Sequence, residues 1–131
     1  MNDLALLLDR LLPLAAEAGA RIVAIRARPQ AVLAKADGSP LTEADLAAEA
    51  VIAAGLPTAA PGIAVVSEEA AEHTPPPAGA PFLLVDPLDG TREFAAGRDS
   101  FAVCIGLVEH GRPVLGAVAL PAHAEVFSGI I

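Results

Sequence analysis

The sequence predicts an α+β fold in which two N-terminal helices pack on a mostly antiparallel sheet. Apolar residues recur at three- and four-residue steps through residues 4–25, and a second helical segment begins after Thr42. From residue 63 onward, short apolar runs alternate with turn residues, which is typical of strands. Helices followed by a run of strands is the element order of an α+β domain.

The two helices carry end signals of different kinds. Pro13 marks either the start of the main part of the first helix or a kink in it, because proline has no N–H to donate. Thr42 is predicted to cap the second helix, with Asp45 in the positively polarised first turn. Gly55 is predicted to end that helix. The segment between the helices, residues 32–41, is predicted to form a short hairpin around Asp37 and Gly38.

The second part of the chain is predicted to hold about five strands. Two long apolar runs flank His110 and Gly111, which indicates a hairpin. A short helix is predicted to open at Gly90. The predicted strands are residues 63–67, 82–86, the two runs within 101–121, and 125–131.

Bulk composition excludes several classes of partner. The 131 residues suffice for one domain, and the net charge of -8 argues against binding a nucleic-acid polymer or an anionic membrane. No apolar run approaches the ~18 residues of a membrane span, and the N-terminus is interpreted as mature sequence of a cytoplasmic protein. Cys104 is the only cysteine, so an internal disulfide is excluded, and it is interpreted as a small buried apolar residue.

The sequence stops at Ile131, inside a predicted strand. A sheet with helices on one face and an uncovered edge strand tends to associate. This pattern favours either the front part of a larger fold or a homodimer.

Acidic residues follow two of the predicted strands. Asp86 and Asp89 lie in VDPLDGT, residues 85–91, and Glu68 follows residues 63–67. A turn explains Asp89 followed by Gly90, but neighbouring strands would bring three carboxylates together, and Mg²⁺ prefers such oxygen ligands. The spacing D-x-x-D-G-T disfavours an aspartyl-phosphate enzyme of the haloacid dehalogenase type, which has D-x-D-G-T.

Three motifs carry a family resemblance. KADGSPLTEAD at residues 35–45, VVSEE at residues 65–69 and VDPLDGT at residues 85–91 resemble, in this order, the N-terminal motifs of the inositol monophosphatase superfamily. The stretch from DGTREF to residue 121 is most similar to the 3'(2'),5'-bisphosphate nucleotidase branch. The resemblance implies that residues 1–131 form a single N-terminal metal- and phosphate-binding domain of the α/β/α/β/α fold.

The resemblance also implies a mechanism that depends on Mg²⁺. Glu68, Asp86 and the carbonyl of Leu88 resemble the ligands of a first metal, while Asp86 and Asp89 resemble those of a second. Gly90 and Thr91 match the residues whose amides receive phosphate. Thr91 and Asp45 resemble the pair that activates the attacking water, assisted by Glu68. The implied reaction removes the 3'-phosphate of adenosine 3',5'-bisphosphate, giving AMP without a covalent intermediate.

The sequence departs from the family in one respect. Family members are longer, and their second half supplies another aspartate ligand in a W-D-x-A-type motif, which this sequence does not contain. The second metal site and the substrate pocket are therefore expected to be incomplete. Three hypotheses stay open: a bisphosphate nucleotidase, a phosphatase acting on inositol phosphates or fructose 1,6-bisphosphate, and a non-catalytic domain that binds metal or phosphate.

Overall fold

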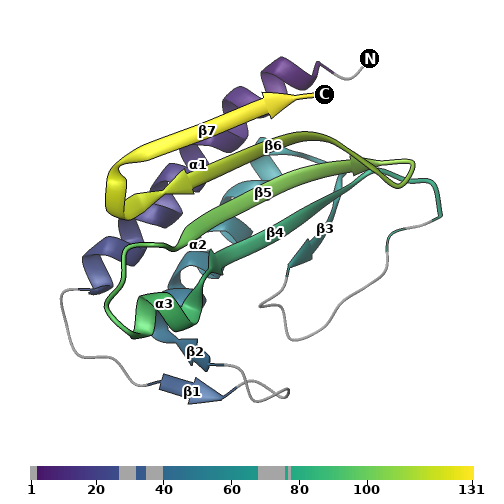
Figure 1. Ribbon diagram of the computed structural model, residues 1–131. Helices are drawn as coiled ribbons and strands as arrows, with labels where there is room; N and C mark the ends of the chain where they lie inside the picture. Colours follow the sequence, from purple (N-terminus) through teal and green to yellow (C-terminus); the bar gives the residue numbers. More distant parts are fainter. Residues whose placement is uncertain (1–2, 27–31, 35–39, 68–75, 77) are drawn as a thin grey trace.

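Figure 1 shows the computed structural model, which describes residues 3–26, 32–34, 40–67, 76 and 78–131. Helices come first and the main sheet follows, as predicted. The elements in chain order are α1 (Leu4–Arg26), β1 (Val32–Ala34), β2 (Pro40–Thr42), α2 (Glu43–Ala59), β3 (Ala64–Ser67), β4 (Phe82–Asp89), α3 (Thr91–Ala95), β5 (Ala102–Glu109), β6 (Arg112–Leu120), the short 3-10 helix η1 (Pro121–His123) and β7 (Glu125–Ile130).

The main sheet has five strands in the order β3-β4-β5-β6-β7. β3 is parallel to β4, and the other neighbouring pairs are antiparallel, which confirms the predicted mixture. Helices α1 and α2 lie side by side against one face of this sheet (Figure 1). The β5–β6 hairpin turns at His110 and Gly111, whose φ angles of 51° and 74° suit a tight two-residue turn.

The core fills the space between the two long helices and the sheet. Leu11 and Ile22 of α1 are fully buried, as are Leu83 and Ile105 of the central strands. α1 runs without interruption through Pro13, so this residue neither starts the helix nor divides it. The apolar face that α1 presents to the sheet stabilises the helix despite the missing N–H.

The predicted end of α2 is wrong. Thr42 caps the helix as expected, but α2 continues past Gly55 and Pro57 to Ala59. Gly55 serves packing instead, because a Cβ there would lie 2.4 Å from Cδ1 of Leu14 in α1. The absence of a side chain at Gly55 therefore lets the two helices approach closely.

A second difference concerns β4, which was expected to end at Asp86. The strand continues to Asp89, with a register shift between Asp86 and Asp89 against β5. The stretch VDPLDGT is thus a bulged strand end followed by a helix, not a turn.

The small hairpin predicted between the two helices is confirmed by antiparallel pairing of Val32 with Thr42, while Asp37 and Gly38 lie outside the described residues.

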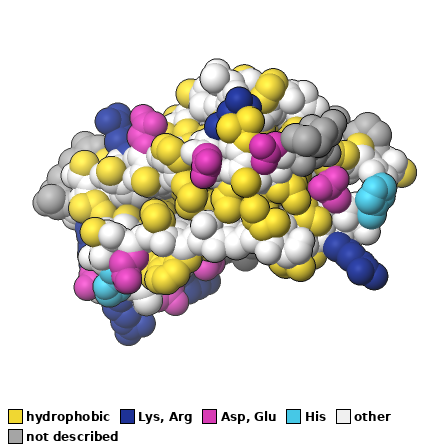
Figure 2. Space-filling model, turned by 90° about the horizontal axis from the view of Figure 1, so that it is seen from above, with side chains coloured by type: hydrophobic (Ala, Val, Ile, Leu, Met, Phe, Trp, Pro, Cys, Tyr) yellow, Lys and Arg dark blue, Asp and Glu magenta, His cyan; other side chains and the backbone are white. Residues whose placement is uncertain are grey.

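The face of the sheet away from α1 and α2 is apolar and open. Leu84 of β4 is 52% exposed, and Phe127 of β7 is 54% exposed. Figure 2 shows apolar side chains gathered across the middle of one view of the molecule, with acidic side chains beside them. No helix within the described ranges is long and apolar enough to cross a membrane.

We predict that Gly55→Ala lowers the free energy of unfolding by about 1–3 kcal/mol, because the new methyl group overpacks against Leu14. Urea denaturation would measure the change. In a Leu14→Ala background the obstructing atoms are gone, so the same substitution should instead stabilise α2 by up to about 1 kcal/mol through helix propensity. Equal effects in the two backgrounds would contradict the packing role of Gly55.

Candidate active site

The site is built around Asp45, the third residue of α2, which is 0% exposed. Its Oδ2 atom accepts hydrogen bonds from the backbone N of Thr42 at 2.8 Å and from Thr42 Oγ1 at 2.7 Å. The Asp45 amide lies 3.4 Å from Thr42 Oγ1 and completes a reciprocal capping box. The local sequence Thr42-Glu-Ala-Asp45 therefore holds one oxygen of this carboxylate through contacts only three residues apart in the chain.

The second oxygen of Asp45 faces the sheet. Thr91 Oγ1 donates a hydrogen bond to Asp45 Oδ1 at 2.9 Å and also lies 3.3 Å from the carbonyl oxygen of Leu88. Thr91 is the first residue of α3, and Leu88 belongs to the end of β4. One hydroxyl thus joins the start of α2 to the junction between β4 and α3, as the sequence resemblance implied for Asp45 and Thr91.

The bulge in β4 sets the directions of the two acidic residues. Asp86 pairs with Cys104 and Asp89 with Ala102, so two residues of β4, Pro87 and Leu88, stand opposite the single residue Val103 of β5. A proline is tolerated there because a bulge interrupts the hydrogen-bond ladder of the strand. Asp86 is half-buried and Asp89 is exposed, while the side chain of Leu88 is buried and its carbonyl stays near Thr91.

Gly90 makes the change of direction from β4 into α3. Its φ of 91° and ψ of 39° lie in the left-handed region that other residues rarely adopt. A Cβ at this position would lie 2.8 Å from the carbonyl oxygen of Ser100 and 3.3 Å from Cα of Phe101. Both the backbone conformation and the close approach of the following loop therefore require glycine before Thr91.

The predicted ligand Glu68 lies outside the described residues, but the strand before it is in place. Ser67, the last residue of β3, is opposite Val85, which directly precedes Asp86. Ser67 Oγ donates a hydrogen bond to Glu49 Oε2 at 2.5 Å. Glu49 was not among the predicted site residues. Its position four residues after Asp45 on α2, and hence on the same helix face, was the signal that could have identified it.

Cys104 was expected to be a buried apolar residue, and the structure corrects this interpretation. It is half-buried on the open face of the sheet, paired with Asp86. Burial, followed by the negative charges of Asp89 and Asp86, raises the pKa of its thiol to about 11. A thiol with this pKa is protonated and unreactive at neutral pH.

The oxygen atoms at this strand end suit a hard divalent cation. The Asp86 and Asp89 carboxylates and the Leu88 carbonyl are ligands of the type that Mg²⁺ prefers, and a bound cation would neutralise the two negative charges. No three acidic, histidine or cysteine side chains cluster closely enough to form a complete metal site within the described ranges, which omit Glu68.

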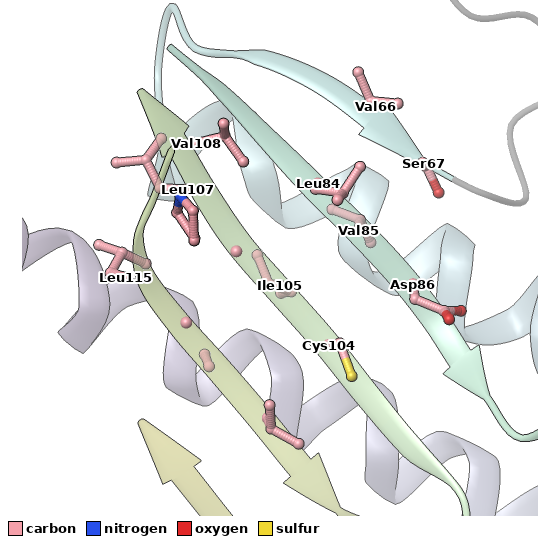
Figure 3. Close-up of a pocket in the computed structure, with 15 residues that line it drawn as sticks. Val66, Ser67, Leu84, Val85, Asp86, Cys104, Ile105, Leu107, Val108 and Leu115 are labelled. Carbon is pink, nitrogen blue, oxygen red and sulfur yellow. The ribbon is translucent and has the colours of Figure 1, made fainter. Parts of the chain in front are cut away.

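A hollow of about 740 Å³ borders these residues on the open face of the sheet. Figure 3 shows Ser67, Asp86 and Cys104 toward one end of it, on three adjacent strands. Apolar side chains, including Val66, Leu84 and Val108, line the remainder. The polar end of the hollow is therefore the part suited to a cation and a phosphate group.

Known proteins resemble this chain in sequence and in fold. A model of the inositol monophosphatase family matches residues 4–131. The 3'(2'),5'-bisphosphate nucleotidase CysQ of Shigella flexneri is 42% identical over 130 residues, which cover 93% of this chain and 51% of that protein. Among solved structures, CysQ from Bacteroides thetaiotaomicron is similar with a TM-score of 0.76 and 34% identity, over 95% of this chain and 45% of that chain. The inositol monophosphatase from Anabaena is similar with a TM-score of 0.79 and 29% identity, over 98% of this chain and 45% of that chain.

The chain therefore belongs to the inositol monophosphatase family. It spans about half the length of the curated relatives it matches. The resemblance drawn from the three sequence motifs is confirmed at the level of the family and its fold.

We predict that Gly90→Ala destabilises the protein more than Gly97→Ala does. Both glycines have positive φ angles, 91° and 80°, so each substitution should cost about 1–2 kcal/mol in backbone strain. Only at Gly90 does the new Cβ meet the backbone of Ser100, which should add about 1–3 kcal/mol. Thermal or urea unfolding of the two variants would measure the difference, and equal losses would show that the loop does not press on Gly90.

Proposed function

We propose that the protein is an Mg²⁺-dependent phosphomonoester hydrolase that removes the 3'-phosphate of adenosine 3',5'-bisphosphate, giving AMP and phosphate. The observation that carries the proposal is the hydrogen bond from Thr91 to the buried carboxylate of Asp45, placed at the strand end that holds Asp86 and Asp89. Family membership supports phosphatase chemistry, and the similarity to CysQ supports the substrate. Residues 1–131 would be the domain that supplies metal and phosphate binding.

In this proposal, the metal is held by Asp86, Asp89 and the Leu88 carbonyl, together with Glu68. Bound Mg²⁺ lowers the pKa of a water ligand and neutralises charge on the phosphoryl oxygens. The second metal site needs a carboxylate that this sequence does not contain.

Thr91 and Asp45 orient the attacking water. Thr91 Oγ1 donates its own proton to Asp45 Oδ1, so the lone pairs of the hydroxyl oxygen are left to accept a hydrogen bond from water. Asp45 is itself held by Thr42 through two hydrogen bonds to its other oxygen, and it cannot rotate away without losing them. Gly90 and Thr91 contribute backbone amides to the phosphate, because the first N–H groups of a helix lack partners inside it.

A second candidate is the same hydrolysis of inositol phosphates or fructose 1,6-bisphosphate. The structural similarity to the Anabaena inositol monophosphatase, with a TM-score of 0.79, favours it. The two candidates share the residues named above and differ only in the group that carries the phosphate. A domain that binds metal and phosphate without catalysis is the remaining alternative.

The proposal predicts phosphate release from adenosine 3',5'-bisphosphate that requires Mg²⁺ and exceeds release from inositol 1-phosphate.

Asp86→Asn should abolish Mg²⁺ binding, measured by calorimetry, with an unchanged circular dichroism spectrum, because it removes a charged ligand at a half-buried position. Asp9→Asn, on the exposed face of α1, is the matched control and should bind normally. Binding of Mg²⁺ and phosphate without release from either substrate would favour the non-catalytic alternative.

We predict that Thr91→Val lowers kcat by about 10²–10⁴-fold and changes KM little, because it removes the hydroxyl that orients water. Thr91→Ser retains the hydroxyl and should keep most of the activity. Steady-state phosphate release at saturating Mg²⁺ would measure both variants. A Thr91→Val variant as active as Thr91→Ser would exclude this role.

A further inference from the structure

Arg26, the last residue of α1, holds the loop between α3 and β5. Its Nη2 atom donates hydrogen bonds to the carbonyl oxygens of Gly97 at 3.0 Å and Arg98 at 3.1 Å. The same atom lies 2.7 Å from Asp99 Oδ1. More than seventy residues of sequence separate Arg26 from this loop, so the contact is a tertiary one that ties the first helix to the far side of the site.

The guanidinium group also stacks on the aromatic part of the loop. Its Cζ atom lies 5.1 Å from the centroid of the Phe101 ring, within the range of a cation–π contact. Phe101 is 1% exposed, and its ring meets Phe94 of α3 edge-on, with centroids 5.2 Å apart. Arg26 therefore contacts the loop through both its backbone carbonyls and the buried ring that supports α3.

The opposite side of this loop packs closely against Gly90, the residue before Thr91. Ser100 O and Phe101 Cα are the atoms that a Cβ on Gly90 would meet. A displacement of the loop would thus remove the surface against which Gly90 is packed, and Gly90 sets the direction of the α3 N-terminus. Arg26 is therefore linked to Thr91 in three steps. Arg26 contacts the loop, the loop contacts Gly90, and Gly90 is bonded to Thr91.

We propose that Arg26 is a positioning residue for the turn formed by Gly90 and Thr91, and that it acts through the loop of residues 97–101. This inference rests on the proposed function, in which that turn receives phosphate. The exposed ion pair with Asp99 contributes little by itself, since such pairs are screened by water. The planar guanidinium matters because it serves two carbonyls and one aromatic face at once, which a lysine ammonium does not reproduce.

Three variants test the inference in the full chain: Arg26→Ala, Arg26→Lys and, as the control, Arg21→Ala, an exposed arginine on the same helix. Hydrogen exchange of the backbone amides reports the order of the loop and the turn, and calorimetry reports the binding of inorganic phosphate with Mg²⁺ present. Arg26→Ala should accelerate exchange at residues 91–101 by at least about tenfold while residues 102–120 keep their protection. Phosphate affinity should fall by about tenfold, with Mg²⁺ affinity within about twofold of the parent value, because the metal ligands on β4 are not moved.

Arg26→Lys should give intermediate values, and Arg21→Ala should match the parent protein in both measurements. Added guanidinium ion at millimolar concentration should restore part of the phosphate affinity of Arg26→Ala and have no effect on Arg21→Ala. Accelerated exchange with unchanged phosphate affinity would overturn the inference, because Arg26 would then only anchor the loop. Unchanged exchange would overturn it as well. Absence of phosphate binding in the parent protein would instead refute the proposed function on which the inference rests.

Discussion

The buried carboxylate of Asp45 is the constraint on which the arrangement of the site depends. A carboxylate removed from water is costly unless hydrogen bonds replace its solvation. Thr42 satisfies one oxygen and Thr91 satisfies the other. Thr42 lies at the start of α2 and Thr91 just after the end of β4. The hydrogen bonds to Asp45 therefore fix the distance between the start of α2 and the end of β4. A shift of either would leave a buried charge without its full set of hydrogen bonds.

The strand end meets this constraint through an irregular backbone. A regular β4 would point alternate side chains to opposite faces, and Asp86 and Asp89 would then lie on different sides of the sheet. The bulge at Pro87 and Leu88 changes that alternation and turns the Leu88 carbonyl toward Thr91. Gly90 then changes the chain direction from β4 into α3. The backbone of Ser100 and Phe101 lies so close to Gly90 that there is no room for a side chain. The irregular backbone at the end of β4 therefore brings two carboxylates, a carbonyl and a hydroxyl into the same region.

Features decided by neighbouring residues could be predicted from the sequence. The Thr42 cap, the helix after Gly90 and the hairpin at His110 and Gly111 depend on local backbone chemistry, and the structure confirms all three. Motif order was sufficient to indicate the family. The pairing of Asp45 with Thr91 was suggested by the resemblance alone, and a hydrogen bond joins the two side chains.

Features decided by distant contacts could not be predicted in this way. Gly55 looked like a helix end because a glycine that accommodates Leu14 of another helix has the same local signature. The extension of β4 depends on pairing with β5, and the partial burial of Cys104 depends on which sheet face is covered. Arg26 had no local signal at all, since its partners lie more than seventy residues away.

The open sheet face adds a final physical argument about the surroundings of Asp86. Gly106, Gly116 and Gly129 pair in register across β5, β6 and β7, and Leu84 continues the row on β4. Nothing lies within 4 Å of a Cβ built at Gly116 or Gly129, so the row is a shallow apolar trough. A sheet face that meets water normally carries polar side chains. The trough leads to Asp86, so any layer packed on it would also border this carboxylate. The strand end that carries the two carboxylates and the apolar surface of the sheet are therefore separate parts of the fold, although they adjoin at Asp86.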